Sequence, residues 1–415
     1  MTPPLTRPPK KNPVPRTRRP TVPPSTRSRV ALGLTAAAAE GRFALQKCDR
    51  CGNVQYPAQE MCRACLSEQV RWATVSQRGH LLSDTTLHHS NELFFRERLP
   101  WRLGLVQLDC GPTVIAHVHD DCRSNSAVRV TAKLDRSGQA VMIALPEHDT
   151  PHMSDEKRYR EFVCDPKFRR VLVTDGKSAV GQALVHALVA AGTSMVFVGV
   201  AEPWKRATGF QSVAALPQVQ VMPLDVTDTD SLLEVAGEVG SKIDILINSA
   251  DHNRTSAVLE KRDVNTAHDE IEVNYLGLLR LAQIFGPIMR GRGADGQNSA
   301  CAWVNLLSIY ALTNFPAFGS WAASKAAAYS ASQCLRAEMR EAGIRVVNVF
   351  PGPIEDEWHQ LILPPKLTPA ALAAAVIGAL KDGVEDVFPG AVAQDLIARW
   401  RECPKTVERE LALER

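Results

Sequence analysis

The sequence of 415 residues predicts an α/β protein in which a Rossmann-type, doubly wound parallel sheet follows a small metal-binding module and a small β-barrel. Three observations carry this prediction. Short apolar runs alternate with helical patterns over roughly the last 245 residues, two Cys-x-x-Cys pairs lie near the N-terminus, and short strand-like runs follow those pairs. A hydrophobic content of 45% is sufficient for two or three domains with real cores.

The first 28 residues predict a disordered tail, because they are rich in Pro and Arg and hold almost no large apolar side chains. The apolar run Val30–Ala39 behind them mimics a signal peptide, but we interpret it as a helix that leads into the metal module. It is also far too short to span a membrane. We expect folded domains at 29–69, 70–147 and 169–415, with a polar linker at 148–168.

The two cysteine pairs predict a metal site. Cys48-x-x-Cys51 and Cys62-x-x-Cys65 are separated by ten residues, a spacing suited to one tetrahedral zinc ion. Because all four ligands are cysteines, no coordination position stays open for water, and we predict structural zinc; a redox dithiol is the minor alternative. The other six cysteines lack any framework spacing, and a thiolate zinc site suits a reducing compartment, so we expect a cytoplasmic protein.

Short apolar or alternating runs follow the cysteines at Gly79–Ser83, Gly104–Leu108 and Thr113–Val118. Strands at this spacing indicate a small barrel. Together, residues 29–147 resemble the rubredoxin-like zinc-ribbon plus OB-fold proteins that accompany thiolase-type enzymes. The resemblance implies a module that assists acyl-CoA binding or bridges to a thiolase-fold partner, without catalysis of its own.

An OB fold also raises the alternative of nucleic-acid binding, since its aromatic and basic side chains could stack on bases and contact phosphates. The distribution of charge argues against it. The net charge is +3 and the first 30 residues hold eight basic and no acidic side chains, so the rest of the chain carries −5 and is a poor nucleic-acid binder. We expect the aromatics to fill the barrel or a protein contact. The side chains concerned are Trp72, Phe94, Phe95, Trp101, Arg96, Arg98 and Arg102.

The C-terminal part begins with the apolar run Arg170–Thr174, a turn and the helical pattern Val180–Ala191, which together predict the opening of a dinucleotide-binding βαβ unit. Ser194–Val200 predicts the second strand, and Ile243–Asn248 a buried parallel strand. Further strands are predicted at Trp303–Leu307 and at Val346–Ile354, the second of which runs into a Pro-Gly turn.

The segment Phe318–Lys325, with Ser308 thirteen residues before Trp321, resembles the active-site block of the short-chain dehydrogenase/reductase family, in which a serine precedes Tyr-x-x-x-Lys by about that interval. Trp321 stands at the tyrosine position. The resemblance makes Asn274 the structural and proton-relay asparagine, and Lys325 the lysine that lowers the tyrosine pKa and holds the nicotinamide ribose. An indole N–H has no proton to exchange near neutral pH, so we expect Asn274, Ser308 and Lys325 to be remnants of the catalytic relay.

The cofactor site also departs from the family, whose phosphate loop reads Thr-Gly-x-x-x-Gly-x-Gly. Residues 174–181 read Thr-Asp-Gly-Lys-Ser-Ala-Val-Gly, so Asp175 brings a carboxylate and Ala179 a methyl group close to a doubly charged ligand. Asp251 adds a second new carboxylate at the end of the element that starts at Asn248. The resemblance therefore implies weak or no binding of NAD(P). Its vestigial cofactor contacts would be Thr174, Gly181, Asp225, Val226, Asn248 and Lys325.

We interpret the chain as a non-catalytic accessory subunit of an acyl-CoA-processing complex, with a thiolase-like enzyme or an active short-chain dehydrogenase as its partner. In the short-chain dehydrogenase/reductase family, the long helices around the catalytic block build the oligomer interface. Their counterparts here lie near His268–Met289 and Trp321–Ala342, so the resemblance also implies an oligomer. The competing hypothesis is an NAD(P)H-dependent reductase that acts on an acyl-CoA or ketone and takes its proton from Tyr310. A nucleic-acid-binding protein is the third and least favoured class.

Overall fold

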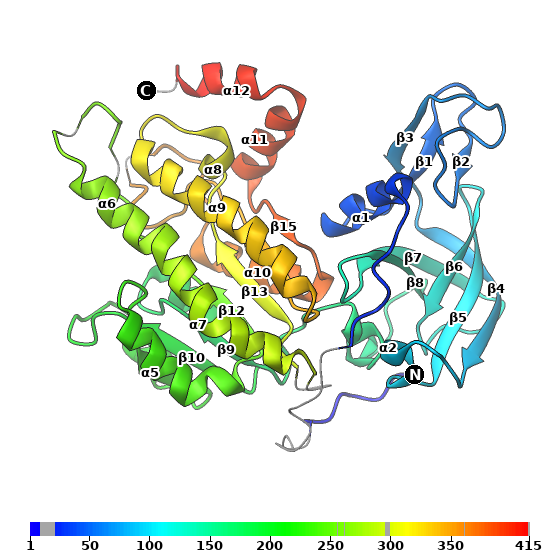
Figure 1. Ribbon diagram of the computed structural model, residues 1–415, viewed down its shortest axis with the longest axis horizontal. Helices are drawn as coiled ribbons and strands as arrows, with labels where there is room; N and C mark the ends of the chain where they lie inside the picture. Colours follow the sequence, from blue (N-terminus) through cyan, green and yellow to red (C-terminus); the bar gives the residue numbers. More distant parts are fainter. Residues whose placement is uncertain (9–20, 255, 261, 295–298, 361, 414–415) are drawn as a thin grey trace. The chain divides into compact units, whose positions relative to one another are not determined.

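The computed structural model describes residues 1–8, 21–254, 256–260, 262–294, 299–360 and 362–413 (Figure 1). It contains two compact units: an N-terminal unit of residues 1–7, 21–165 and 382–384, and a C-terminal unit that starts at Pro166 and holds the rest of the described chain. Within the predicted tail, residues 9–20 lie outside the described residues, and the described stretches 1–8 and 21–28 form no helix or strand. No described helix combines the length and apolar character needed to cross a bilayer.

The N-terminal unit begins with the helix α1 (Leu32–Ala39) and a small antiparallel sheet in the order β2-β1-β3. The cysteine pairs lie on and beside this sheet, because Cys48 is the last residue of β1. Leu34 and Ala38 of the helix pack into the same apolar core as Leu45 of the sheet. The strands are β1 (Ala44–Cys48), β2 (Val54–Gln55) and β3 (Val70–Thr74).

A closed barrel of five strands in the order β4-β5-β6-β8-β7 completes this unit. Alternation of side chains makes the barrel interior: β6 buries Val114, Ala116 and Val118 and exposes Thr113 and Ile115. The strands are β4 (Arg78–Leu87), β5 (Trp101–Leu108), β6 (Thr113–Val118), β7 (Ala127–Leu134) and β8 (Ala140–Pro146), with α2 (Leu93–Arg96) between β4 and β5.

The aromatic residues that raised the nucleic-acid alternative lie largely inside the unit. Phe94 and Trp101 are buried in one apolar cluster with Phe162, and Phe95 packs against it. Trp72 packs against the barrel core. These rings fill the interior, as expected, and are not arranged as an exposed platform for bases.

The C-terminal unit is built on a parallel sheet of seven strands in the order β11-β10-β9-β12-β13-β14-β15. After β9 the chain adds β10 and β11 on one side of that strand, then returns to form β12 on its other side and continues to β13, β14 and β15. The strands β9 and β12 therefore flank a topological switch point. This order confirms the predicted doubly wound α/β class. The strands are β9 (Arg170–Val173), β10 (Met195–Val200), β11 (Val219–Pro223), β12 (Ile245–Asn248), β13 (Ala302–Leu306), β14 (Arg345–Val349) and β15 (Asp386–Val387).

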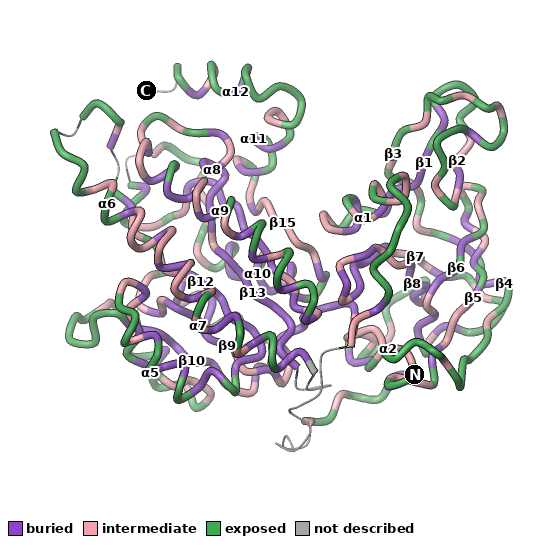
Figure 2. The backbone as a smooth tube through the Cα atoms, in the orientation of Figure 1, coloured by how far each residue is buried: buried purple, intermediate pink, exposed green. Residues whose placement is uncertain are grey.

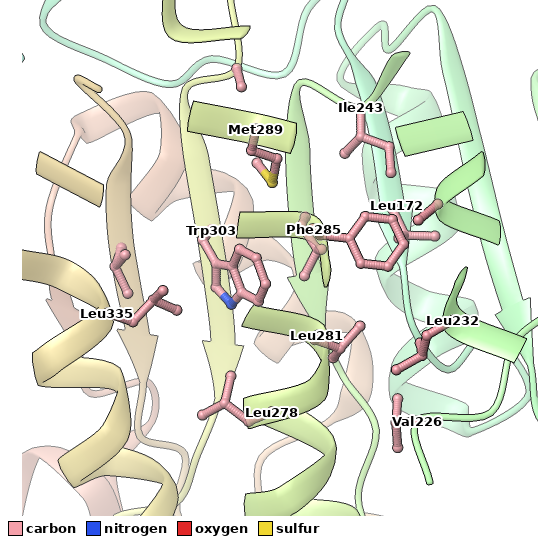
Figure 3. Close-up of a cluster of buried hydrophobic side chains, with 14 of the residues drawn as sticks. Leu172, Val226, Leu232, Ile243, Leu278, Leu281, Phe285, Met289, Trp303 and Leu335 are labelled. Carbon is pink, nitrogen blue, oxygen red and sulfur yellow. The ribbon is translucent and has the colours of Figure 1, made fainter. Parts of the chain in front are cut away.

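One face of the sheet is covered by α5 (Thr229–Val239), α7 (Gly277–Gly291) and α9 (Gly319–Arg340), and Figure 2 shows that the strands beneath them are largely buried. The apolar side chains of these helices meet the strands in a large buried cluster (Figure 3). Trp303 lies between Phe285 and Leu335, and its buried indole N–H donates to Asn305 Oδ1 at 2.8 Å. Helix α3 (Ala179–Ala190) packs on β9 and β10. The other helices are α4 (Phe210–Ala214), α6 (Asn265–Ile271), α8 (Tyr310–Thr313), α10 (Pro369–Asp382), α11 (Ala391–Glu402) and α12 (Pro404–Leu411).

The long helix predicted near His268–Met289 is divided into three parts. A π-helical turn, Glu272–Leu276, joins α6 to α7 and contains Asn274. A single π-turn inside a helix rotates the residues that follow it and is frequent at functional sites. The helix predicted at Trp321–Ala342 forms as α9, which starts two residues earlier than expected, at Gly319.

Candidate functional site

The four cysteines of the zinc ribbon converge on one point. Their sulfur atoms all lie within 4.8 Å of one another, with Cys48 Sγ 3.6 Å from Cys65 Sγ and Cys51 Sγ 3.5 Å from Cys62 Sγ. Sulfurs bound at about 2.3 Å to a tetrahedral zinc ion would be about 3.8 Å apart, so this donor set fits the metal. The geometry confirms the prediction of a structural zinc site with all four positions filled by protein.

Two similar turns place these sulfurs. Gly52 N–H donates to Cys48 O, and Leu66 N–H donates to Cys62 O, each at 2.9 Å. Both donors have a left-handed backbone, with φ of +73° at Gly52 and +58° at Leu66. Backbone N–H groups of Cys65 and then Ala64 point at the Cys62 sulfur and lower the pKa of that thiol to about 6. The thiolate, which is the form that binds zinc, is therefore favoured at neutral pH.

In the C-terminal unit, Trp321 and Lys325 lie one turn apart on α9 and share one acceptor. The Trp321 indole N–H donates to Asp251 Oδ1 at 2.9 Å, and the Lys325 ammonium lies 3.0 Å from the same oxygen. Lys325 also donates to Leu306 O at 3.3 Å. The side chain of Lys325 is 3% exposed and that of Asp251 is 37% exposed. The Asp251 carboxylate thus pairs with both Trp321, which stands at the tyrosine position, and Lys325.

The other two predicted relay residues bond elsewhere. Ser308 Oγ donates to Pro351 O at 3.5 Å. Asn274 binds the backbone of His252 on both sides, donating from Nδ2 to its carbonyl at 2.9 Å and accepting its N–H at 3.0 Å. Asn274 Nδ2 also lies 2.8 Å from Ser324 Oγ. These contacts hold the loop that carries Asp251 against α9, which is a structural role.

In the phosphate loop between β9 and α3, side chains of the loop itself accept the backbone N–H groups. Asp175 Oδ1 accepts the Lys177 backbone N–H at 3.0 Å, and Ser178 donates to the same carboxyl group. Asp175 is partly buried, and this burial raises the pKa of its carboxyl group. Ser178 Oγ caps α3 by accepting Gly181 N–H at 3.0 Å, and Ala179 exposes its methyl group. The amides that a pyrophosphate would use at a helix N-terminus are already bound, so these residues do not fit that ligand.

The remaining predicted cofactor residues lie along the carboxyl edge of the sheet. Thr174 Oγ1 donates to Asn248 Oδ1 at 3.1 Å and so joins the ends of β9 and β12. Asp225 Oδ1 accepts the Thr227 backbone N–H at 2.8 Å, and Val226 is buried in the core. Each of these side chains has a partner inside the unit.

From the sequence, Asp175 and Asp251 were expected only to oppose a ligand, and the groups that they bind were not predicted. For Asp175 there was a signal, because an aspartate in a turn before a helix typically accepts the backbone N–H of residue i+2 with its carboxylate. For Asp251 there was none, since its two partners on α9 are about 70 residues away.

Comparisons with known proteins agree with this architecture. Residues 35–71 match the family model of the ChsH2 rubredoxin-like zinc ribbon domain, residues 72–137 that of the ChsH2 C-terminal OB-fold domain, and residues 169–363 that of short chain dehydrogenases. An uncharacterized oxidoreductase of Staphylococcus aureus (strain N315) is 29% identical over 218 residues, which are 50% of this chain and 89% of that protein. One from Mycobacterium bovis is 30% identical, covering 52% of this chain and 64% of its own length.

Two solved structures are similar to the C-terminal unit. A short chain dehydrogenase from Burkholderia cenocepacia J2315, crystallised in complex with NADP, is 31% identical with a TM-score of 0.54, covering 60% of this chain and 98% of that one. A short-chain dehydrogenase from Streptomyces avermitilis is 26% identical with a TM-score of 0.50, covering 59% and 95%. The chain is therefore a fusion of ChsH2-type zinc-ribbon and OB-fold domains with a domain that belongs to the short-chain dehydrogenase/reductase family.

Proposed function

We propose that this protein is a non-catalytic accessory subunit of a complex that processes acyl-CoA substrates. The dehydrogenase domain, residues 169–415, serves assembly, and the zinc ribbon and OB fold, residues 29–69 and 70–147, bind or bridge to a thiolase-like enzyme or an active short-chain dehydrogenase. The complex forms in the cytoplasm and is oligomeric. We assign the segment 148–168, of which the residues up to Asp165 belong to the compact N-terminal unit, to the connection between these parts.

One observation carries the proposal: the indole of Trp321 replaces the acid/base hydroxyl and donates its N–H to Asp251, which also binds Lys325. An indole N–H cannot be exchanged as a catalytic proton near neutral pH. The lysine that would hold a ribose is engaged by a carboxylate of the same chain. Both changes remove functions that turnover of a dinucleotide-dependent reaction requires.

The second candidate is an NAD(P)H-dependent reductase, and the NADP complex of the similar Burkholderia dehydrogenase favours it. Its proton would have to come from Tyr310, which is buried and packs against Phe315 and Phe318. Glu202 lies two residues after the end of β10, in the region where the cofactor preference of this fold is usually set, and β10 itself contains no basic side chain for the 2′-phosphate of NADP.

Turnover separates the two candidates. We expect no oxidation of NADPH or NADH by the purified chain with acyl-CoA or ketone substrates. Trp321→Tyr alone should not restore it, because the phosphate loop is also altered, although acid/base catalysis typically contributes about 10²–10⁴-fold. Robust oxidation that is abolished by Ser308→Ala would replace the accessory role with the reductase.

Partner capture tests the accessory role directly. The full chain, used as bait in a native lysate, should recover a thiolase-fold enzyme or an intact short-chain dehydrogenase. Cys62→Ser serves as the matched bait, because it disrupts the zinc ribbon and leaves the dehydrogenase domain folded. Recovery of neither partner class by the intact bait would contradict the proposal, and loss with Cys62→Ser would assign the contact to the N-terminal unit.

A further inference from the structure

The donors that meet at the switch point of the sheet form two groups. The first group consists of the backbone N–H groups of Lys177 and Ser178 at the start of α3, where the helix dipole adds partial positive charge. The second group consists of the Lys325 ammonium and the Trp321 indole N–H on α9. In a nucleotide-binding fold such convergent donors are completed by an anionic ligand. Here each group is completed by one aspartate of the chain itself.

The side chain of Lys177 connects the phosphate loop to the segment after β10. The Lys177 ammonium donates to the carbonyls of Glu202 and Lys205 in the segment that follows β10. Gln182 Nε2 reinforces this by donating to Lys177 O at 2.9 Å and Thr208 O at 3.0 Å. The cation that could balance a phosphate charge is therefore bound to backbone oxygens, and the segment 202–208 is tied to the phosphate loop.

We propose that Asp175 and Asp251 are built-in substitutes for the negatively charged and oxygen-bearing parts of a dinucleotide. Asp175 takes the amides that would hold a pyrophosphate, and Asp251 takes the lysine that would hold a ribose. The inference rests on the proposed non-catalytic function, and it adds that these two carboxylates keep the domain folded without a cofactor and exclude NADH and NADPH from it. Replacing both by glycine opens the site.

Isothermal titration of the full chain with NADPH and with NADH tests this. We compare the natural protein with the double variant Asp175→Gly/Asp251→Gly. Removal of two carboxylates facing a dianionic ligand should tighten binding of at least one dinucleotide by about tenfold or more, since a tenfold change corresponds to only about 1.4 kcal/mol. The double variant should also melt at a lower temperature without ligand and regain stability when the dinucleotide is added.

Asp263→Asn is the matched control. Asp263 Oδ1 accepts the Asn265 backbone N–H at 3.0 Å, the same type of contact and distance as Asp175 with Lys177, but at an exposed position outside the site. Its affinity for dinucleotides should equal that of the natural protein. If circular dichroism shows that the glycine variant is unfolded, Asp175→Asn/Asp251→Asn keeps the acceptor oxygens, removes both charges and should show the same direction of change.

The proposal is overturned if the folded variants bind NADH and NADPH no more tightly than the natural chain, or if the natural chain binds either with the affinity of the double variant. This readout is an affinity ratio that needs neither turnover nor a partner. Failure to capture a partner would therefore refute the accessory role and leave this inference standing, whereas an unchanged ratio would refute the inference alone.

Discussion

In the zinc ribbon, four sulfur atoms of the same chemical kind converge within 4.8 Å of one another, whereas in the dehydrogenase domain two N–H donors converge on the carboxylate of Asp251. The sulfurs of the first site are all electron donors as thiolates, so a bound cation such as zinc holds them together. The groups of the second site are complementary, so they hold one another. Both sites stem from families that bind a ligand, but only the first is incomplete without one.

This contrast shows how dependence on a ligand can be read from the contacts of a site. A cluster of like groups makes the ligand part of the fold, because binding free energy becomes folding free energy. A cluster of paired groups makes the fold independent of the ligand, and an incoming ligand must first displace an internal partner.

The largest effect is expected from loss of zinc. Cys62→Ser should reduce zinc from one per chain to near zero, and the zinc ribbon should unfold, since structural zinc contributes about 10–16 kcal/mol in small zinc-binding peptides. Elemental analysis and thermal unfolding measure both effects. Cys110→Ser, a cysteine outside the cluster, should keep the zinc and the transition. A Cys62→Ser protein with full zinc content would show that Cys62 is not a ligand of the metal.

Acidification should affect the two units in opposite senses. Trp101 Nε1–H donates to His117 Nδ1 at 2.6 Å, and burial lowers the pKa of His117 from 6.5 to about 4. The unfolded chain then binds more protons, so stability of the N-terminal unit is lost as pH falls from 6.5 to 4, by up to about 3 kcal/mol. Burial raises the pKa of Asp175, so at this group the folded C-terminal unit binds more protons than the unfolded chain and gains stability as pH falls through that pKa.

Urea unfolding between pH 4 and pH 7 measures this difference. His117→Gln keeps an acceptor for the indole and removes the titration, so the acid loss of the N-terminal unit should flatten in that variant. Equal pH slopes of the natural protein and His117→Gln would show that His117 does not carry the effect.

The Asp251–Lys325 pair should respond unequally to removal of its two members. Asp251→Ala leaves the Lys325 ammonium, 3% exposed, without its counter-charge and should cost about 2–3 kcal/mol. Lys325→Met leaves a carboxylate that is 37% exposed and reaches water, so the loss should be about 1 kcal/mol. Chemical denaturation of both variants gives the order, and equal losses would contradict the difference in solvation.

The smallest expected effect lies in a zinc-ribbon turn. Leu66 is 74% exposed at φ +58°, a backbone conformation that costs a non-glycine residue about 1–2 kcal/mol. Leu66→Gly should therefore stabilise the ribbon by about 0.5–1 kcal/mol in thermal unfolding. Leu82→Gly, at a comparably exposed strand position with ordinary φ, should destabilise by a similar amount. Destabilisation by both variants would show that the left-handed turn is not strained.

Much of the architecture was predictable because it depends on local spacing. The cysteine pairs, the apolar strands and the block around Trp321 are patterns of neighbouring residues, and they led to the zinc ribbon, the barrel and the doubly wound sheet that the structure contains. The helix near Asn274 was less predictable. The apolar period continues through Glu272–Leu276, and the π-turn there contains Asn274, whose side chain bonds to His252 outside the helix.

By itself, the sequence determined the fold, the metal ligands and the replacement of the catalytic tyrosine, because residue identity and short-range period carry that information. Only the tertiary structure decided what the unusual residues bind. In the dehydrogenase domain, Asp251 pairs with Trp321 and Lys325 from a distant segment of the chain. In the barrel, His117 of β6 accepts the indole N–H of Trp101 of β5. The physical reason is that a hydrogen bond or ion pair depends on position in space, which strand order and helix packing fix after the local pattern has been read.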